Sequence, residues 1–185
     1  MMTNSLCHDA LSRKTPMNPT MHTTSVPVFT QMLGGLSDVL TKAEAHAALK
    51  KIEPSVFLQA RLFPDMFALA QQVQVACDFA ASVSARLAGV DVPVFDFKAD
   101  TFADLQARIN AVKAFINGLS PAAFEGSAAR DIVLRPGTPK EKHLNGQAYL
   151  SNYGMPQFFF HVTTAYAVLR HNGLEVGKKD YMGAY

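Results

Sequence analysis

One helical segment near the C-terminal end carries the residues whose types and spacing most clearly suggest chemistry. Gln157 and His161 are four residues apart in the segment 156–166, so they lie on one face of a helix. This spacing lets two side chains of one helix reach a common metal ion. Glutamine, however, offers only a neutral carbonyl oxygen, which is a poor ligand for a borderline metal. Spacing alone favours a simpler interpretation, a buried histidine that is hydrogen-bonded to a neighbouring helix.

A second candidate is Asp78, which interrupts an apolar run. A carboxylate at the edge of an apolar surface needs a partner. An equally good interpretation is a solvated residue on the polar stripe that also contains Gln74 and Ser82. The spacing does not decide between these two roles.

Several function classes have no support in the sequence. No nucleophile elbow, phosphate-binding glycine loop or dinucleotide fingerprint occurs, so the common cofactor enzymes are disfavoured. The net charge is +2 and the basic residues are scattered, which argues against nucleic-acid binding. No apolar stretch approaches the length of a membrane span. The two cysteines, Cys7 and Cys77, lack metal or redox spacing, and this usage suits a cytoplasmic location.

Four amphipathic segments must position these residues. Apolar residues recur at three- and four-residue steps, which predicts helices over 28–50, 65–87, 101–119 and 156–172. The third has a capping-box spacing at Thr101 and Asp104, and Gly89 ends the second. Segment 130–135 alternates polar and apolar residues and predicts a short β-arm that pairs with 142–144.

These elements predict an all-α fold, a four-helix bundle with a short β-arm between the third and fourth helices. Residues 1–24 are expected to form a flexible leader and residues 25–185 a single domain; residues 1–20 should be dispensable. The tail after residue 176 shows no period and is expected to be a surface segment. Only 17% of residues are charged, which is low and indicates that a second subunit covers part of the surface. We therefore expect a homodimer.

Several motifs resemble an uncharacterised bacterial family, the domain of unknown function numbered nineteen ninety-three. The resemblance rests on the segments ARLFPDMF at 60–67, QVQVACD at 72–78 and FHVTTAY at 160–166, with LRHNG at 169–173 and GKKDY at 177–181. This family is similar, more remotely, to the DinB/YfiT-like helical bundles. Many of those proteins are dimers that bind a divalent metal through three histidines, and some transfer or isomerise low-molecular-weight thiols.

The resemblance implies a site at matching positions of this sequence. Asp78 takes the position of the histidine on the second helix, while Gln157 and His161 take those of the later histidine pair. Only one of the three histidines is therefore present. The implied ligands of a zinc, nickel or iron ion are Asp78, Gln157 and His161, with Tyr166, Arg170 and Gln74 around the pocket.

Two hypotheses follow from this resemblance. One is a metal-dependent or thiol-linked transferase or hydrolase acting on an unidentified small molecule, or a metal-free variant in which Asp78 orients His161 as a general base. The other is a non-catalytic dimeric binding or scaffold protein, in which the three polar side chains form a closed hydrogen-bond network.

Overall fold

The computed structural model describes residues 20–96 and 98–185. Most of the predicted leader, residues 1–24, lies outside the described residues. Its last four residues belong to the first helix, α1, which spans Met21–Lys50. None of the described helices is both long and apolar enough to cross a bilayer.

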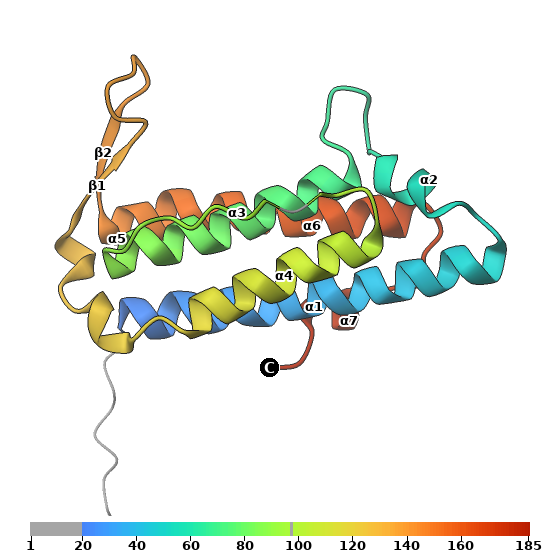
Figure 1. Ribbon diagram of the computed structural model, residues 1–185, viewed down its shortest axis with the longest axis horizontal. Helices are drawn as coiled ribbons and strands as arrows, with labels where there is room; N and C mark the ends of the chain where they lie inside the picture. Colours follow the sequence, from blue (N-terminus) through green and yellow to red (C-terminus); the bar gives the residue numbers. More distant parts are fainter. Residues whose placement is uncertain (1–19, 97) are drawn as a thin grey trace, which may run out of the picture.

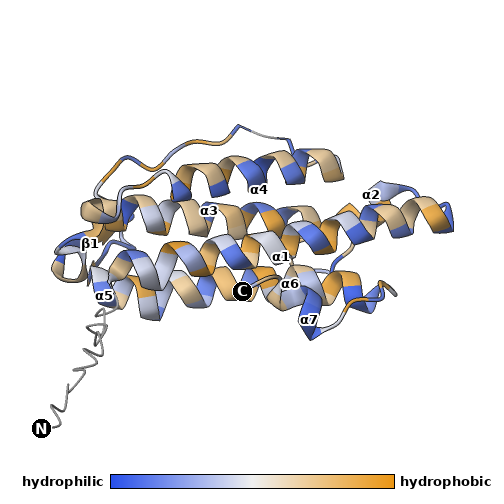
Figure 2. Ribbon diagram, turned by 90° about the horizontal axis from the view of Figure 1, so that it is seen from below, coloured by the Kyte–Doolittle hydropathy of each residue, from blue (hydrophilic) through white to orange (hydrophobic). Residues whose placement is uncertain are grey.

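Four long helices lie side by side (Figures 1 and 2). They are α1, α3 (Leu69–Ala88), α4 (Phe102–Asn117) and α6 (Met155–His171). α3 packs against both α4 and α6, and α1 packs against the same two helices. Each long helix contributes fully buried side chains to one core, among them Phe29, Leu69, Leu105 and Phe158. The chain is therefore mostly helical, as predicted.

α1 begins seven residues earlier than the periodicity predicted. Thr20 and Thr23 form a reciprocal capping box that stabilises the start of α1 at Met21. Pro27 lies inside the helix, although proline lacks an N–H and normally breaks or kinks a helix. The buried side chains of Met21 and Val26 hold this first part of α1 against the core. Tertiary packing thus outweighs the local preference.

The predicted second helix is present but begins later, because α3 starts at Leu69 rather than at Asp65. A short helix that was not predicted, α2 (Pro54–Gln59), lies in the loop before it. The predicted ends are confirmed elsewhere: Gly89 caps α3 in the left-handed conformation, at a φ of 72°. Thr101 and Asp104 form the predicted capping box at the start of α4.

The predicted β-arm is present. Strands β1 (Asp131–Leu134) and β2 (Lys142–Asn145) pair antiparallel, with Val133 opposite His143, and project from one end of the helices (Figure 1). Two 3₁₀ turns, Pro121–Phe124 and Ser127–Ala129, lead into the arm. The chain then runs through α5 (Gly146–Ala148) and a π-helical turn, Tyr149–Gly154, directly into α6.

The C-terminal tail showed no period and was expected to be a surface segment; part of it is helical. Helix α7 (Lys178–Met182) packs against α1. Gln31 donates a hydrogen bond to the Met182 carbonyl oxygen over 2.9 Å, and Lys42 forms an ion pair with Asp180. The tail therefore covers part of α1.

Candidate functional site

His161 lies between α6 and α3, largely removed from solvent. Its residue surface is 7% exposed, and its ring stacks between those of Phe67 and Phe79 at interplanar angles of 15°. Phe160 meets the same ring edge-on. Its Nδ1 is 2.7 Å from the side-chain oxygen of Gln72 on α3. The structure thus agrees with the simpler interpretation, a buried histidine bonded to a neighbouring helix.

The hydrogen bonds around Gln72 determine which nitrogen of His161 carries the proton. The amide nitrogen of Gln72 donates to the Phe67 carbonyl oxygen over 3.1 Å, so the amide oxygen must face His161. An amide oxygen only accepts, and Nδ1 of His161 is therefore the protonated nitrogen. In the neutral ring, Nε2 keeps a free lone pair.

Burial lowers the pKa of His161 below its ordinary value of 6.5, because the charged imidazolium loses its hydration among aromatic rings. The ring is consequently neutral at physiological pH. A neutral imidazole whose other nitrogen donates to a fixed oxygen resembles both a general base and a metal-bound histidine.

Asp78 and Arg108 form an ion pair between α3 and α4. The Arg108 Nη2 to Asp78 Oδ1 distance is 2.5 Å, and Nη1 of the arginine donates to the Phe95 carbonyl oxygen over 3.0 Å. The exposed fractions of the two side chains differ strongly, 8% for Arg108 and 56% for Asp78. Asp78 is therefore neither a simply solvated residue nor a partner of His161. It neutralises a buried guanidinium.

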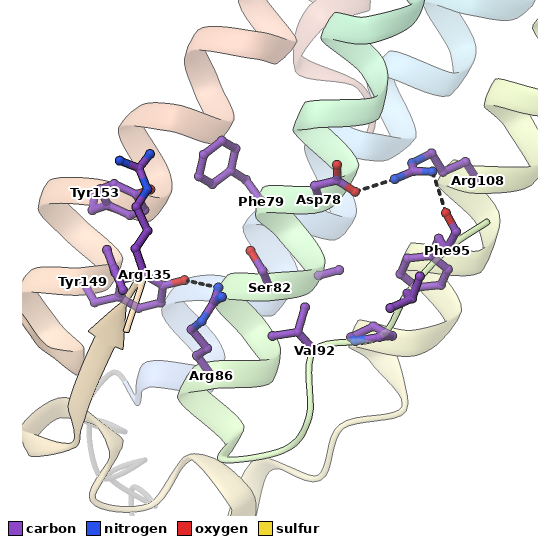
Figure 3. Close-up of a pocket in the computed structure, with 14 residues that line it drawn as sticks. Asp78, Phe79, Ser82, Arg86, Val92, Phe95, Arg108, Arg135, Tyr149 and Tyr153 are labelled. Atoms are coloured by element: carbon purple, nitrogen blue, oxygen red, sulfur yellow. Dashed lines mark hydrogen bonds and ion pairs between the residues drawn. The ribbon is translucent and has the colours of Figure 1, made fainter. Parts of the chain in front are cut away.

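A cleft opens beside this ion pair. It has a volume of about 480 Å³ and lies between α3, the α3–α4 connector, the end of β1 and the π-helical turn (Figure 3). Its polar groups are Asp78, Ser82, Arg86, Arg108 and Arg135. The rest of its wall is mainly apolar or aromatic: Phe79, Ala81, Val92, Pro93, Val94, Phe95, Leu134, Tyr149 and Tyr153.

Arg86 and Tyr149 fix one end of the cleft. Nη1 of Arg86 donates to the Tyr149 hydroxyl oxygen over 3.1 Å (Figure 3). Burial raises the pKa of that hydroxyl, and the positive charge of Arg86 opposes the shift. The hydroxyl is therefore neutral at physiological pH.

A smaller cavity of about 230 Å³ adjoins the cleft. The two cavities share Leu134, Arg135 and Tyr153, and the smaller one is also lined by Gln157 and two lysines of the β-arm, Lys140 and Lys142. Gln157 thus lies in the smaller cavity and Asp78 in the larger one. His161 lines neither, although Phe79 both contacts its ring and lines the larger cavity.

The three predicted ligands do not fit a ready three-ligand metal centre. Asp78 is occupied by a guanidinium, whose charge would repel a metal ion, and His161 is bonded to Gln72. Across the described ranges, 20–96 and 98–185, no group of three or more His, Cys, Asp or Glu side chains could hold a metal ion. Metal binding by Asp78, Gln157 and His161 stays a prediction.

The other predicted pocket residues lie elsewhere. Tyr166 donates to the Val176 carbonyl oxygen over 3.4 Å and packs edge-on against Tyr181 of α7. Arg170 is exposed and donates to the Leu174 carbonyl oxygen over 3.3 Å. Gln74 is half-buried on α3. None of the three lines the cleft or the smaller cavity.

Several residues of the site region were not predicted, among them Gln72, Arg108 and Arg135. Arg108 carries a usable signal, because it lies three residues after Leu105 and four before Val112, on the apolar stripe of α4. An arginine at such a position needs a carboxylate partner. Gln72 and Arg135 carry no comparable signal, since their roles depend on contacts between segments distant in the sequence.

Cys77 does not contribute reactive chemistry. It is fully buried on α3, and burial raises the pKa of its thiol to about 12. The thiolate is the nucleophilic form of cysteine, so Cys77 behaves as a small core residue.

Comparison with known proteins identifies relatives of the whole helical region. The profile described as Domain of unknown function (DUF1993) matches residues 21–182. The chain is also similar to a crystal structure of a DinB family member protein from Shewanella denitrificans, with 42% sequence identity and a TM-score of 0.83. That match covers 89% of this chain and 92% of the other. No curated protein matches the chain.

Proposed function

Because the chain belongs to the family described as Domain of unknown function (DUF1993), we propose that it is a DinB-like four-helix-bundle protein that binds a small organic molecule in the cleft beside α3. The bundle would comprise α1, α3, α4 and α6, which pack around one core. Ligand sites of such bundles are commonly built from side chains of neighbouring helices.

The observation that carries the proposal is the cleft itself. Its volume of about 480 Å³ falls within the range of small-molecule sites, roughly 300–1,000 Å³. Its wall is mainly apolar and aromatic, with a few polar groups, and that combination is typical of such sites. The part of the α3–α4 connector that lines the cleft, residues 92–95, leaves Val94 92% exposed, so an apolar surface lies at the opening.

Binding can be tested by saturation-transfer NMR with a mixed library of small organic molecules. Ser82 is half-buried and lines the cleft, so a Ser82→Trp variant would fill it. Gln71→Trp places the same ring at an exposed position of α3 and serves as the matched control. We expect compounds that bind the wild type and the control but not Ser82→Trp. Failure to find any compound, or equal binding to all three proteins, would contradict the proposal.

A second candidate is the metal-dependent or thiol-linked transferase or hydrolase activity suggested by the family resemblance. The observation that favours it is the state of His161, which is neutral and keeps a lone pair on Nε2. A three-ligand centre would require Asp78 to leave Arg108, and Cys77 cannot supply the thiol. Within the part of the chain that the structure describes, no reactive thiol is available, so a thiol would come from a small-molecule substrate, and His161 could act as its base without a metal.

Metal content decides between the two versions of this candidate. Untagged protein should be incubated with zinc, nickel and iron ions and analysed by elemental mass spectrometry, beside a His161→Ala variant. Near-stoichiometric metal that is lost in the variant would establish a centre containing His161. Metal in neither protein would leave metal-free chemistry at His161 or a purely binding function.

A further inference from the structure

We propose that the cleft selects amphipathic organic anions, molecules that combine a carboxylate, sulfonate or phosphate group with a flat apolar body. This inference rests on the proposed binding function and names the chemical class of its ligand. It is carried by the charges that line the two adjoining cavities and by the arrangement of their aromatic rings.

Cationic side chains dominate the polar lining. Arg86, Arg108 and Arg135 line the larger cavity, and Asp78 is the carboxylate among the residues that line it. The smaller cavity shares Arg135 with the larger one and is lined by two further cationic residues, both lysines, and by no carboxylate. A cleft lined by one sign of charge attracts ligands of the opposite sign.

The single carboxylate is already neutralised. Asp78 is bonded to Arg108, so that these two charges compensate each other. Arg86 bonds to the neutral Tyr149 hydroxyl, which accepts a hydrogen bond but offers no negative charge. No carboxylate within the described part of the chain pairs with the guanidinium of Arg86 or Arg135. Both guanidinium groups remain available for an anion, which the planar fork of arginine binds with two parallel hydrogen bonds.

The position of Arg135 supports this assignment. It directly follows β1 with a φ of 53°, in the left-handed region that a residue with a side chain rarely adopts. Its side chain extends along the Tyr149 and Tyr153 side of the cleft (Figure 3). Unusual backbone conformations of this kind concentrate at ligand-binding positions.

The apolar part of the ligand is indicated by the walls. Tyr153 is half-buried and presents an aromatic wall beside Arg135, and the fully buried Tyr149 stacks behind it with ring centroids 5.8 Å apart and an interplanar angle of 21°. On the other side, Val92 and Val94 of the connector are partly to almost fully exposed. A flat apolar group between these walls would cover both surfaces while its anionic group meets the guanidinium groups.

Two fluorescent dyes that share one aromatic framework provide the test. Anilinonaphthalene sulfonate carries a negative charge, and phenylnaphthylamine lacks it. Fluorescence titration of the full chain should show binding of the sulfonate at least about tenfold tighter than that of the neutral dye. Arg86→Gln and Arg135→Asn should each weaken the sulfonate about tenfold without affecting the neutral dye. Lys50→Gln removes an exposed charge of α1 and should change neither affinity.

The outcomes separate this inference from the function on which it rests. Equal affinity for the two dyes, with both lost in Ser82→Trp, would overturn the selectivity for anions but leave the binding function intact. Binding that survives in Ser82→Trp, or no binding of either dye, would overturn both. Arg86→Gln removes the hydrogen bond to Tyr149 and can destabilise the fold. If thermal melting shows that Arg86→Gln is destabilised, the result for Arg135→Asn, on the exposed arm, is the one that decides. Unchanged sulfonate affinity in Arg135→Asn overturns the inference.

Discussion

The protonation of His161 links a buried side chain to the stability of the fold. Because its pKa is lowered in the folded chain, the unfolded chain binds a proton more readily just below pH 6.5. The stabilising contribution of the neutral ring is therefore present above that pH and is lost as the pH falls through it. We expect the stability advantage of the wild type over His161→Gln to shrink between about pH 8 and pH 5. Urea denaturation at a series of pH values measures this difference.

The pH dependence of wild-type stability does not isolate His161, because His143 contributes to it with the opposite sign. Hydrogen bonds that His143 on the β-arm donates to the carboxylates of Asp131 and Glu141 raise its pKa, so its contribution is present at low pH and is lost as the pH rises. Gln71→Ala at an exposed position of α3 removes no titratable group and provides a control that should leave the pH profile unchanged. An advantage of the wild type over His161→Gln that stays constant across the range would show that the ring does not titrate as inferred.

The ion pair between Asp78 and Arg108 should respond unequally to removal of its two partners. Asp78→Ala leaves a buried guanidinium without its carboxylate, and we expect a loss of about 2 kcal/mol in unfolding free energy. Arg108→Met leaves a carboxylate that is already 56% exposed and can be hydrated, so the loss should stay below about 1 kcal/mol. Chemical denaturation of both variants tests the asymmetry. Equal losses, or a larger loss in Arg108→Met, would mean that burial of the arginine is not the dominant factor.

The identity of the site could be predicted from the sequence only in part. The spacing of Gln157 and His161 correctly placed both on one helix, but the apolar run around Asp78 left open whether this carboxylate is paired or solvated, and the structure shows that it is paired. The partner is Arg108 rather than His161, because α4 packs against α3 at that position. Such a choice depends on how helices distant in the sequence are packed, and periodicity within one helix does not contain it.

At the scale of elements, Gly34 and Gly35 of α1 have opposite roles although they are adjacent. A Cβ atom at Gly35 would lie 2.8 Å from the Tyr181 carbonyl oxygen, so this glycine permits α7 to approach α1. At Gly34 the nearest atom would be the flexible Lys113 amine at 3.7 Å. We expect Gly34→Ala to stabilise the protein by up to about 1 kcal/mol through its helix propensity. Gly35→Ala should destabilise it by about 1–2 kcal/mol and displace α7.

Thermal melting and limited proteolysis of the C-terminal tail distinguish these outcomes. In Gly35→Ala the displaced tail should be cleaved faster than in the wild type, whereas in Gly34→Ala the rate should be unchanged. Similar effects of the two substitutions would indicate that α7 does not depend on close contact with α1.

The elements themselves were predicted best where short-range chemistry specifies them. The capping box at Thr101 and Asp104, the glycine cap at Gly89 and the alternation in β1 all act within a few residues. The early start of α1 was missed because Pro27 opposes a helix locally while burial of Met21 and Val26 favours it. The same distinction explains α7, whose docking depends on contacts with residues about 140 positions earlier, such as the ion pair of Asp180 with Lys42.

At the scale of the whole molecule, we expect the protein to form a homodimer. Phe67 and Phe160 both contact the ring of His161 and yet are 44% and 54% exposed, so two aromatic side chains from separate segments meet at one surface. Phe63, in the same loop as Phe67, is 63% exposed. Exposed aromatic groups of this kind commonly mark interfaces, and covering them with a second copy would remove their apolar area from water.

Light scattering at micromolar concentration tests this expectation, with Phe160→Asp as the variant that should shift the dimer toward the monomer by placing a charge in the interface. Val94→Asp is the matched control, because Val94 is an exposed apolar residue at the cleft, away from the aromatic surface. If the dimer is lost only in Phe160→Asp, the interface lies beside His161. The monomeric variant should then bind a ligand in the cleft as the wild type does. A monomeric wild type would rule out the dimer and leave the exposed aromatic residues as a surface for a different protein. Loss of the dimer in Val94→Asp instead would place the interface over the cleft, so that ligand binding and dimerisation would compete.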